Sequence, residues 1–139
     1  MKQILAILSI VLFSFSSKAQ KEVTVKWYDW KKLPPTVSTE LKKIKDGATA
    51  TGNLYKTIVQ LIKEDPSETT VTIGVVDMDK DGKMEYAVKM EGSSWCGSHG
   101  CSWDVYKDYG KKQIHLTDYG VKFVSNGVIS SAGLLFKFE

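Results

Sequence analysis

The sequence contains no arginine, and all 19 of its basic residues are lysines. Arginine supplies the planar, bidentate donor that proteins favour for phosphate and carboxylate recognition, so its absence argues against a nucleic-acid-binding protein. Histidine is also scarce, with two residues, and there is no G-x-S-x-G or H-E-x-x-H motif. A hydrolase needs a nucleophile with a base, or two carboxylates held apart in a cleft. The sequence therefore offers little support for an enzyme.

Internal repeats and low-complexity linkers are absent as well. At 139 residues the chain has the length of one domain and is too short for a propeller or a doubly wound enzyme. Its composition, 42% hydrophobic and 25% charged, is that of a globular protein and excludes a disordered or collagen-like chain. The sequence thus predicts a single folded unit with a real hydrophobic core.

The N-terminus has the features of a secretory signal peptide over residues 1–19. A short positive start precedes an apolar run from Ile4 to Phe15, and small residues at Ser17 and Ala19 fit a cleavage site. The run is shorter than the roughly 20 apolar residues that cross a bilayer, and no cysteine follows it as in a lipoprotein. We expect a nearly neutral mature domain, residues 20–139, that is secreted or periplasmic and not inserted in the membrane.

Apolar periodicity predicts one strand followed by two helices. Residues 22–27 alternate like a half-buried strand, with Val23, Val25 and Trp27 on one face. After Pro34 and Pro35 a helix is expected, capped by Thr36 or Ser38, with a stripe of Val37, Leu41, Ile44 and Ala48. A second amphipathic helix starts near Asn53 and ends before Pro66, with a core stripe of Leu54, Ile58, Leu61 and Ile62.

Short apolar runs separated by turn residues predict strands throughout the rest of the chain. Asn126-Gly127 is the strongest two-residue hairpin signal among them. The expected fold is α+β, a mainly antiparallel sheet of about six or seven strands with two helices packed on one face. The runs lie at residues 71–75, 86–90, 103–106, 114–116, 121–124 and 134–138.

An acidic stretch, D-x-D-x-D-G-x-x-E, predicts a calcium site. Carboxylates at alternate positions of a tight loop can point inward together, and Gly82 permits the turn that brings the next backbone carbonyl round. Oxygen ligands of this kind suit a hard cation. The alternative is a solvated acidic turn that binds no ion. The predicted ligands are the side chains of Asp77, Asp79, Asp81 and Glu85 and the carbonyl of Lys83, with water completing the shell.

The first six positions of this loop also match an EF-hand. That motif requires a bidentate glutamate at its twelfth position, where this sequence has Val88, and a helix on each side. Apolar alternation instead places the loop between two strands, so residues 71–90 resemble the strand-loop-strand calcium loops of FG-GAP repeats in integrin-type propellers. The motif occurs once, whereas a propeller needs several blades. The resemblance therefore implies the ion loop and not the propeller.

The only two cysteines, Cys96 and Cys101, flank a glycine-rich tetrapeptide. In an exported domain they are expected to pair, and a turn between them can bring their α-carbons to disulfide distance. We predict a disulfide that stiffens the tip of a hairpin. The C-x-x-x-x-C spacing differs from the C-x-x-C of redox proteins, and two cysteines with two scattered histidines lack the spacing of a zinc site.

Strand alternation around the cysteines assigns side chains to two faces. The predicted core face carries Tyr86, Val88, Met90, Trp103 and Val105. Trp95 falls on the other face with Ala87, Lys89 and Glu91, near Asp104 and Tyr106, where its ring has no obvious burial. A partly exposed tryptophan beside polar groups is a candidate contact for a sugar or a partner protein. The candidate ligand-binding residues are Trp95, Tyr106 and, at the hairpin tip, His99.

Two of these assignments have plain structural alternatives. A bulge or the helices can cover Trp95, and His99 can be an exposed turn residue without a binding role. Trp27, Tyr28 and Trp30 are a further candidate sugar platform, although Trp27 continues the apolar face of its strand and is expected in the core.

The calcium-type loop, the next strand and the W-C-G-x-x-G-C hairpin together resemble, over residues 71–106, an arrangement found in small exported bacterial proteins of unknown function. That resemblance implies no activity. The leading hypothesis is a secreted, non-catalytic binding domain, stabilised by Ca²⁺, that recognises a protein or glycan of the cell envelope. The alternatives are an inhibitor or immunity-type protein against an exported hydrolase, and an enzyme of unrecognised type.

Overall fold

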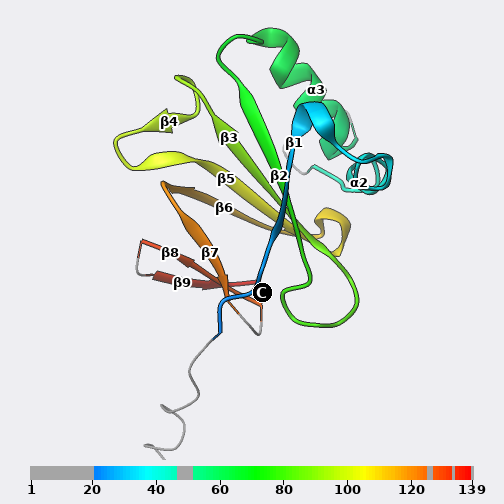
Figure 1. Ribbon diagram of the computed structural model, residues 1–139, viewed down its shortest axis with the longest axis vertical. Coiled ribbons are helices and arrows are strands. Elements are labelled where there is room, and N and C mark those ends of the chain that lie inside the picture. The colour runs from blue at the N-terminus through cyan, green and yellow to red at the C-terminus, as the bar shows by residue number, and fades with distance from the viewer. Residues whose placement is uncertain (1–20, 47–51, 125–126, 133, 139) are drawn as a thin grey trace, which may run out of the picture.

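The computed structural model describes residues 21–46, 52–124, 127–132 and 134–138. Over these residues the chain is α+β and mainly β, as predicted (Figure 1). No helix in the described ranges has both the length and the apolar character needed to span a membrane. The elements are β1 (Lys26–Asp29), a 3₁₀ helix (Trp30–Lys32), α2 (Pro35–Leu41), α3 (Leu54–Glu64), β2 (Thr70–Val76), β3 (Glu85–Glu91), β4 (Cys96–Gly97), β5 (Gly100–Lys107), a second 3₁₀ helix (Asp108–Gly110), β6 (Lys112–Asp118), β7 (Val121–Val124), β8 (Val128–Ser131) and β9 (Leu134–Lys137).

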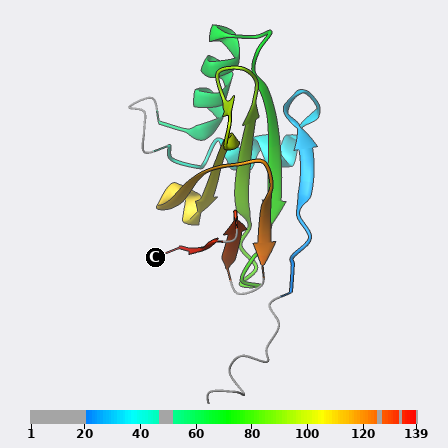
Figure 2. The same ribbon diagram turned by 90° about the vertical axis from the view of Figure 1, so that its left-hand side faces the viewer.

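The strands form two antiparallel sheets. In the large, six-stranded sheet the order is β1-β2-β3-β5, with β4 and β6 also paired to β5. The sequence suggested that the last three strands would extend the large sheet. They instead form a separate sheet in the order β7-β8-β9. Figures 1 and 2 show α2 and α3 toward one end of the molecule and the small sheet toward the other.

The helices cover one face of the large sheet. The apolar stripe of α3 packs as predicted, with Leu54 and Ile58 buried, and the helix begins where the Asn53 side chain accepts the Lys56 N–H at 2.9 Å. The predicted cap of α2 by Thr36 or Ser38 is wrong: α2 begins at Pro35 without a side-chain cap, because proline at the first turn is already preset for a helix. Ala48 lies outside the described residues. The helix-side core comprises Val37, Leu41, Ile44, Leu54, Ile58, Val71, Ile73, Tyr86, Val88, Met90 and Tyr106.

The small sheet covers part of the opposite face. Phe123 of β7 and Ile129 of β8 are buried against side chains from the large sheet, so the molecule has three layers. Asn126 of the predicted hairpin lies outside the described residues, while the strands on either side pair with Val124 opposite Val128. The second core comprises Val76, Met78, Ala87, Trp103, Val105, Leu116, Phe123 and Ile129.

The predicted faces of β5 are wrong. Lys89 pairs with Trp103 and Ala87 with Val105, so Trp103 and Val105 point toward the small sheet and not toward the helices. The reason is the turn between β3 and β4, where Cys96 N–H donates to the Gly92 carbonyl at 2.9 Å. The alternation of side chains along β3 does not continue through this turn, so the positions of the cysteines do not predict which face the side chains of β5 occupy.

The N-terminal segment contacts both sheets. Val23 N–H donates to the Phe123 carbonyl at 2.7 Å, whereas Trp27 pairs with Gly74 in β2. The strand of the large sheet therefore starts at Lys26, later than residues 22–27 suggested. Trp27, expected in the core, is 41% exposed. Its ring meets Trp103 edge-on, with 5.6 Å between centroids.

Tyr28 and Trp30 lie on the helix side. Both are partly buried against the helix-side core, and Trp30 packs on Tyr55 with 5.1 Å between ring centroids. They therefore do not form one platform with Trp27.

Gly74 leaves the space in which the Trp27 ring lies. A Cβ at this position would stand 2.6 Å from the nearest Trp27 ring atom, so Gly74→Ala should push the ring off Trp103. We expect the free energy of unfolding to fall by about 0.5–1.5 kcal/mol, the value of an aromatic pair, with a changed near-ultraviolet circular dichroism spectrum. Gly97→Ala is the control, because its Cβ would meet nothing within 4 Å. Equal behaviour of the two variants would contradict this packing.

Candidate functional site

The acidic loop joins two antiparallel strands, as the sequence predicts. Val76 at the end of β2 pairs with Glu85 at the start of β3. Asp77 shapes the turn between them, because its Oδ1 accepts the Asp81 N–H at 3.2 Å and its Oδ2 accepts the Gly82 N–H at 3.0 Å. Gly82 has φ +84°, a conformation that glycine adopts at little cost. The loop thus folds back on its first carboxylate.

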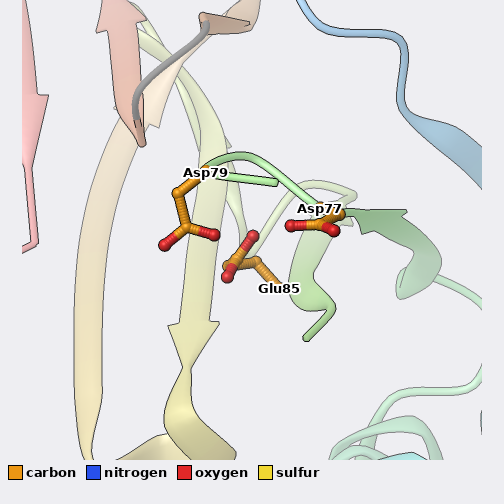
Figure 3. A group of neighbouring side chains, drawn as sticks. All are labelled: Asp77, Asp79 and Glu85. Atoms are coloured by element: carbon orange, nitrogen blue, oxygen red, sulfur yellow. The ribbon is translucent and has the colours of Figure 1, made fainter. Parts of the chain in front are cut away.

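Three carboxylates converge in this loop. Asp77, Asp79 and Glu85 each place an oxygen within 4.8 Å of the others, and Figure 3 shows the Glu85 carboxylate between the other two. Glu85 is only 1% exposed. Oδ1 of Asp79 is buried and has no hydrogen-bond partner, and a buried carboxylate oxygen without a donor favours a cation. This partly buried cluster can hold a metal ion.

The other two predicted ligands lie outside the cluster. Asp81 is exposed, and its Oδ1 accepts the Lys83 N–H at 2.8 Å. Lys83 is exposed as well. Their part in ion binding stays a prediction.

Lys107, at the end of β5, was not identified from the sequence. Its ammonium forms a partly buried ion pair with Oδ2 of Asp79. This hydrogen bond lowers the pKa of Asp79 and raises the pKa of Lys107. No local motif marks Lys107, since 28 residues separate it from Asp79 and only the pairing of the strands brings it to the loop. The lysine compensates part of the negative charge of the cluster.

Glu85 is the carboxylate most changed by its surroundings. Burial raises its pKa from the ordinary 4.5 to about 7, with the negative charge of Asp79 adding to the effect. The Met78 N–H, which donates to Oε2 at 2.7 Å, opposes the shift. The carboxylate is therefore poised to change its charge near neutral pH, and a divalent cation would favour its ionised form.

The cysteine hairpin is formed as predicted. Cys96 and Cys101 are bonded and lie opposite each other, with 3.9 Å between their α-carbons. The hairpin is anchored to the turn between β6 and β7, because Tyr119 Oη donates to the carbonyls of Gly97 at 3.1 Å and Ser98 at 3.3 Å. His99 lies exposed at its tip.

Two of the three candidate ligand-binding residues line one cavity. Trp95 and Tyr106 border a space of about 400 Å³ between α3 and the large sheet, whereas His99 is not among its described lining residues. Trp95 is not on the face that strand alternation indicated. It packs on the helix-side core, partly buried, and its indole N–H donates to Thr69 Oγ1 at 3.2 Å. The apolar lining comes from Leu54, Ile58, Leu61, Val88 and Met90.

Polar side chains from neighbouring strands also border this cavity. Asp104 Oδ1 accepts hydrogen bonds from His115 Nδ1 at 2.9 Å and from Gln113 Nε2 at 3.1 Å. The sequence did not identify His115 and Gln113 as candidate site residues, although alternation along β6 places both on one face. Asp46 adds a second carboxylate to the described lining. The cavity therefore has a polar, hydrogen-bonding side and an apolar wall.

Stability without metal should depend on pH through Glu85. Because folding raises its pKa, the stability that Glu85 contributes is fully present below pH 4.5 and is lost as the pH rises through about 7. In EDTA the melting temperature should fall over this window, and Ca²⁺ should reverse the fall at pH 8. Scanning calorimetry at several pH values measures both effects. Glu85→Gln should flatten the dependence; if it keeps the wild-type profile, Glu85 is not the titrating group.

Replacing Lys107 with methionine should show how much the Lys107 ammonium stabilises the acidic cluster when no metal ion is bound. Without the ammonium the acidic cluster loses its internal cation, so the free energy of unfolding in EDTA should fall by about 1–3 kcal/mol, between the values of exposed and buried ion pairs. The stabilisation by Ca²⁺ should increase. Lys111→Met, at an exposed position, is the control. Thermal melts with and without Ca²⁺ test this. An unchanged calcium response would contradict the view that Lys107 and the ion compete for the same carboxylates.

The chain matches no protein-family model, and no curated protein or solved structure is significantly similar to it. Nothing in the described fold identifies an FG-GAP repeat. What the structure provides is an acidic cluster between two strands and a disulfide-bonded hairpin.

Proposed function

We propose that this protein is a secreted, non-catalytic binding domain, stabilised by Ca²⁺, that recognises a protein or glycan of the cell envelope. The observation that carries the proposal is the placement of Trp95 and Tyr106, two predicted ligand contacts, on the wall of one cavity. Its volume of about 400 Å³ lies within the range of about 300–1,000 Å³ typical of ligand sites. Such sites are mostly apolar with a few convergent polar groups, as here.

The lining of the cavity restricts what it accepts. Asp46 and Asp104 contribute carboxylates to the described lining. Asp104 accepts hydrogen bonds from His115 and Gln113, so the polar side of the cavity offers both donors and acceptors to a ligand. We therefore expect a compact group with an apolar side to enter, either a side chain of a partner protein or a terminal sugar of a glycan.

Calcium has a structural role in this proposal. The ion would bind the side chains of Asp77, Asp79 and Glu85, with the Asp81 carboxylate and the Lys83 carbonyl as further ligands. Glu85 starts the strand that carries Val88 and Met90 into the cavity wall. Holding this end of β3 fixes one side of the cavity, and the lost repulsion between carboxylates is the source of the stabilisation.

The hydrogen bond between Asp104 and His115 favours an enzyme as the second candidate. A carboxylate that orients a histidine through Nδ1 leaves Nε2 to accept a proton, as in general-base catalysis. The described lining contains no serine or cysteine, and the hydroxyl of its threonine, Thr57, donates to the Asn53 carbonyl at 3.2 Å. Such an enzyme would therefore have to activate water, and binding without turnover needs fewer assumptions.

Filling the cavity should abolish recognition. Leu61 lines it, whereas the neighbouring Ile62 lines a separate hollow, so Leu61→Trp and Ile62→Trp form a matched pair on one helix. The tagged mature protein is cross-linked to an envelope fraction, and the captured proteins and sugars are identified by mass spectrometry. We expect Leu61→Trp to reduce the captured partner at least about tenfold, equivalent to about 1.4 kcal/mol, and Ile62→Trp to retain it.

Thermal melts of both variants verify that they are folded. Equal capture by wild type and Leu61→Trp would show that the cavity takes no part in recognition. Equal loss of capture in both variants would show that a larger side chain on α3, and not the filled cavity, is responsible. Cleavage of the captured material that stops in His115→Gln would favour the enzyme.

A further inference from the structure

A second hollow lies on the opposite face of the large sheet. It has a volume of about 390 Å³ and shares no lining residue with the cavity beneath α3. Its floor contains Thr72, Lys89 and Trp103, which lie side by side on β2, β3 and β5. Trp27 of β1 and Tyr119 of the turn between β6 and β7 border it. We call this hollow the Trp27–Tyr119 groove.

Two large aromatic rings are exposed at this groove and yet fixed in place. Trp27 is 41% exposed and Tyr119 is 68% exposed. Trp27 is held over Gly74 and against the edge of Trp103. Tyr119 is held by the hydrogen bonds of its hydroxyl to the hairpin carbonyls. Exposed rings that are already ordered lose little conformational entropy on binding, which favours a ligand that stacks on them.

The polar groups of the groove are balanced in charge. Lys89 and Glu91 form an ion pair within it, and the Lys89 ammonium lies 5.1 Å from the centre of the Trp103 ring. Together with the Thr72 hydroxyl they offer both donors and acceptors without net charge. A charged ligand would have to break the pair, whereas a neutral ligand rich in hydroxyl groups can bond to both partners.

The groove continues past Trp27. A neighbouring hollow of about 360 Å³ shares Trp27 and Val121 with it and extends along Val23 and Val25. Two hollows joined at one tryptophan suit a linear ligand of several units better than a single small molecule. A protein partner would need a contiguous interface of about 1,000 Å² or more, and the charged floor interrupts such a surface.

From these observations we infer that the Trp27–Tyr119 groove binds a neutral oligosaccharide. The apolar C–H faces of its sugar rings stack on Trp27 and Tyr119, and its hydroxyl groups form hydrogen bonds with Lys89, Glu91 and Thr72. This site is independent of the cavity beneath α3, so either proposal can hold without the other.

Titration of the mature protein, with Ca²⁺ present, against a panel of hexasaccharides tests the inference. The neutral panel comprises the hexamers of glucose in β-1,4, β-1,3 and α-1,4 linkage, of N-acetylglucosamine, of xylose and of mannose. Galacturonate and glucosamine hexamers supply the anionic and cationic comparisons. Calorimetry gives the affinity, and the NMR signal of the Trp27 indole N–H reports the location. We expect a neutral hexamer to bind in the millimolar range or tighter and to shift this signal.

Four variants locate the binding. Trp27→Ala and Tyr119→Ala should each weaken it at least about tenfold, and Gly74→Ala should weaken it by displacing the Trp27 ring while keeping the indole. Tyr109→Ala, which removes another exposed tyrosine outside the groove, should bind like wild type. Circular dichroism and thermal melts confirm that each variant is folded.

Four results would overturn the inference. They are the absence of binding by every neutral hexamer, a preference for either charged hexamer, wild-type affinity in Trp27→Ala and Tyr119→Ala, and loss of binding in the cavity variant Leu61→Trp. The last result would place the sugar beneath α3, in support of the proposed function instead.

Discussion

The burial of a carboxylate within the large sheet is the constraint on which the rest of this structure depends. Glu85 begins the central strand β3, and its side chain lies inside the protein beside two aspartates. A buried carboxylate persists only where a proton, a cation or hydrogen bonds replace its lost hydration. The compensating groups come from the loop and from the end of β5, so charge balance holds these segments in one arrangement. The same balance ties the loop to the protonation of Glu85, and the cluster it creates can hold a metal ion.

The second organising feature is that the large sheet has a hydrophobic core on each of its two faces. Helices cover one face and the small sheet covers part of the other, so successive side chains of β3 and β5 enter different cores. Tyr106 therefore faces the cavity beneath α3, while Trp103 forms the floor of the groove on the far side. Two separate hollows are thus lined by residues of the same strands, because successive positions in a strand point to opposite faces.

The sequence predicted local features well and long-range ones poorly. The stripe of α3, the acidic loop and the disulfide rest on spacing within a few residues, and each appears where spacing placed it. The faces predicted for Trp103 and Val105 were wrong because the turn after Gly92 interrupts the alternation of side chains between β3 and β4. Lys107 and His115 were missed because strand register, which no short motif encodes, brings them to Asp79 and Asp104.

The anchoring of the hairpin has a consequence for the compartment in which the protein works. The carbonyls that hold the Tyr119 hydroxyl belong to Gly97 and Ser98, inside the ring closed by the disulfide. In a thiol-rich environment this ring would open, and the tyrosine would lose its fixed acceptors. The orientation of an aromatic side chain more than twenty residues away is thereby linked to the ambient redox potential, so the reduced protein would differ from the disulfide-bonded one at this surface.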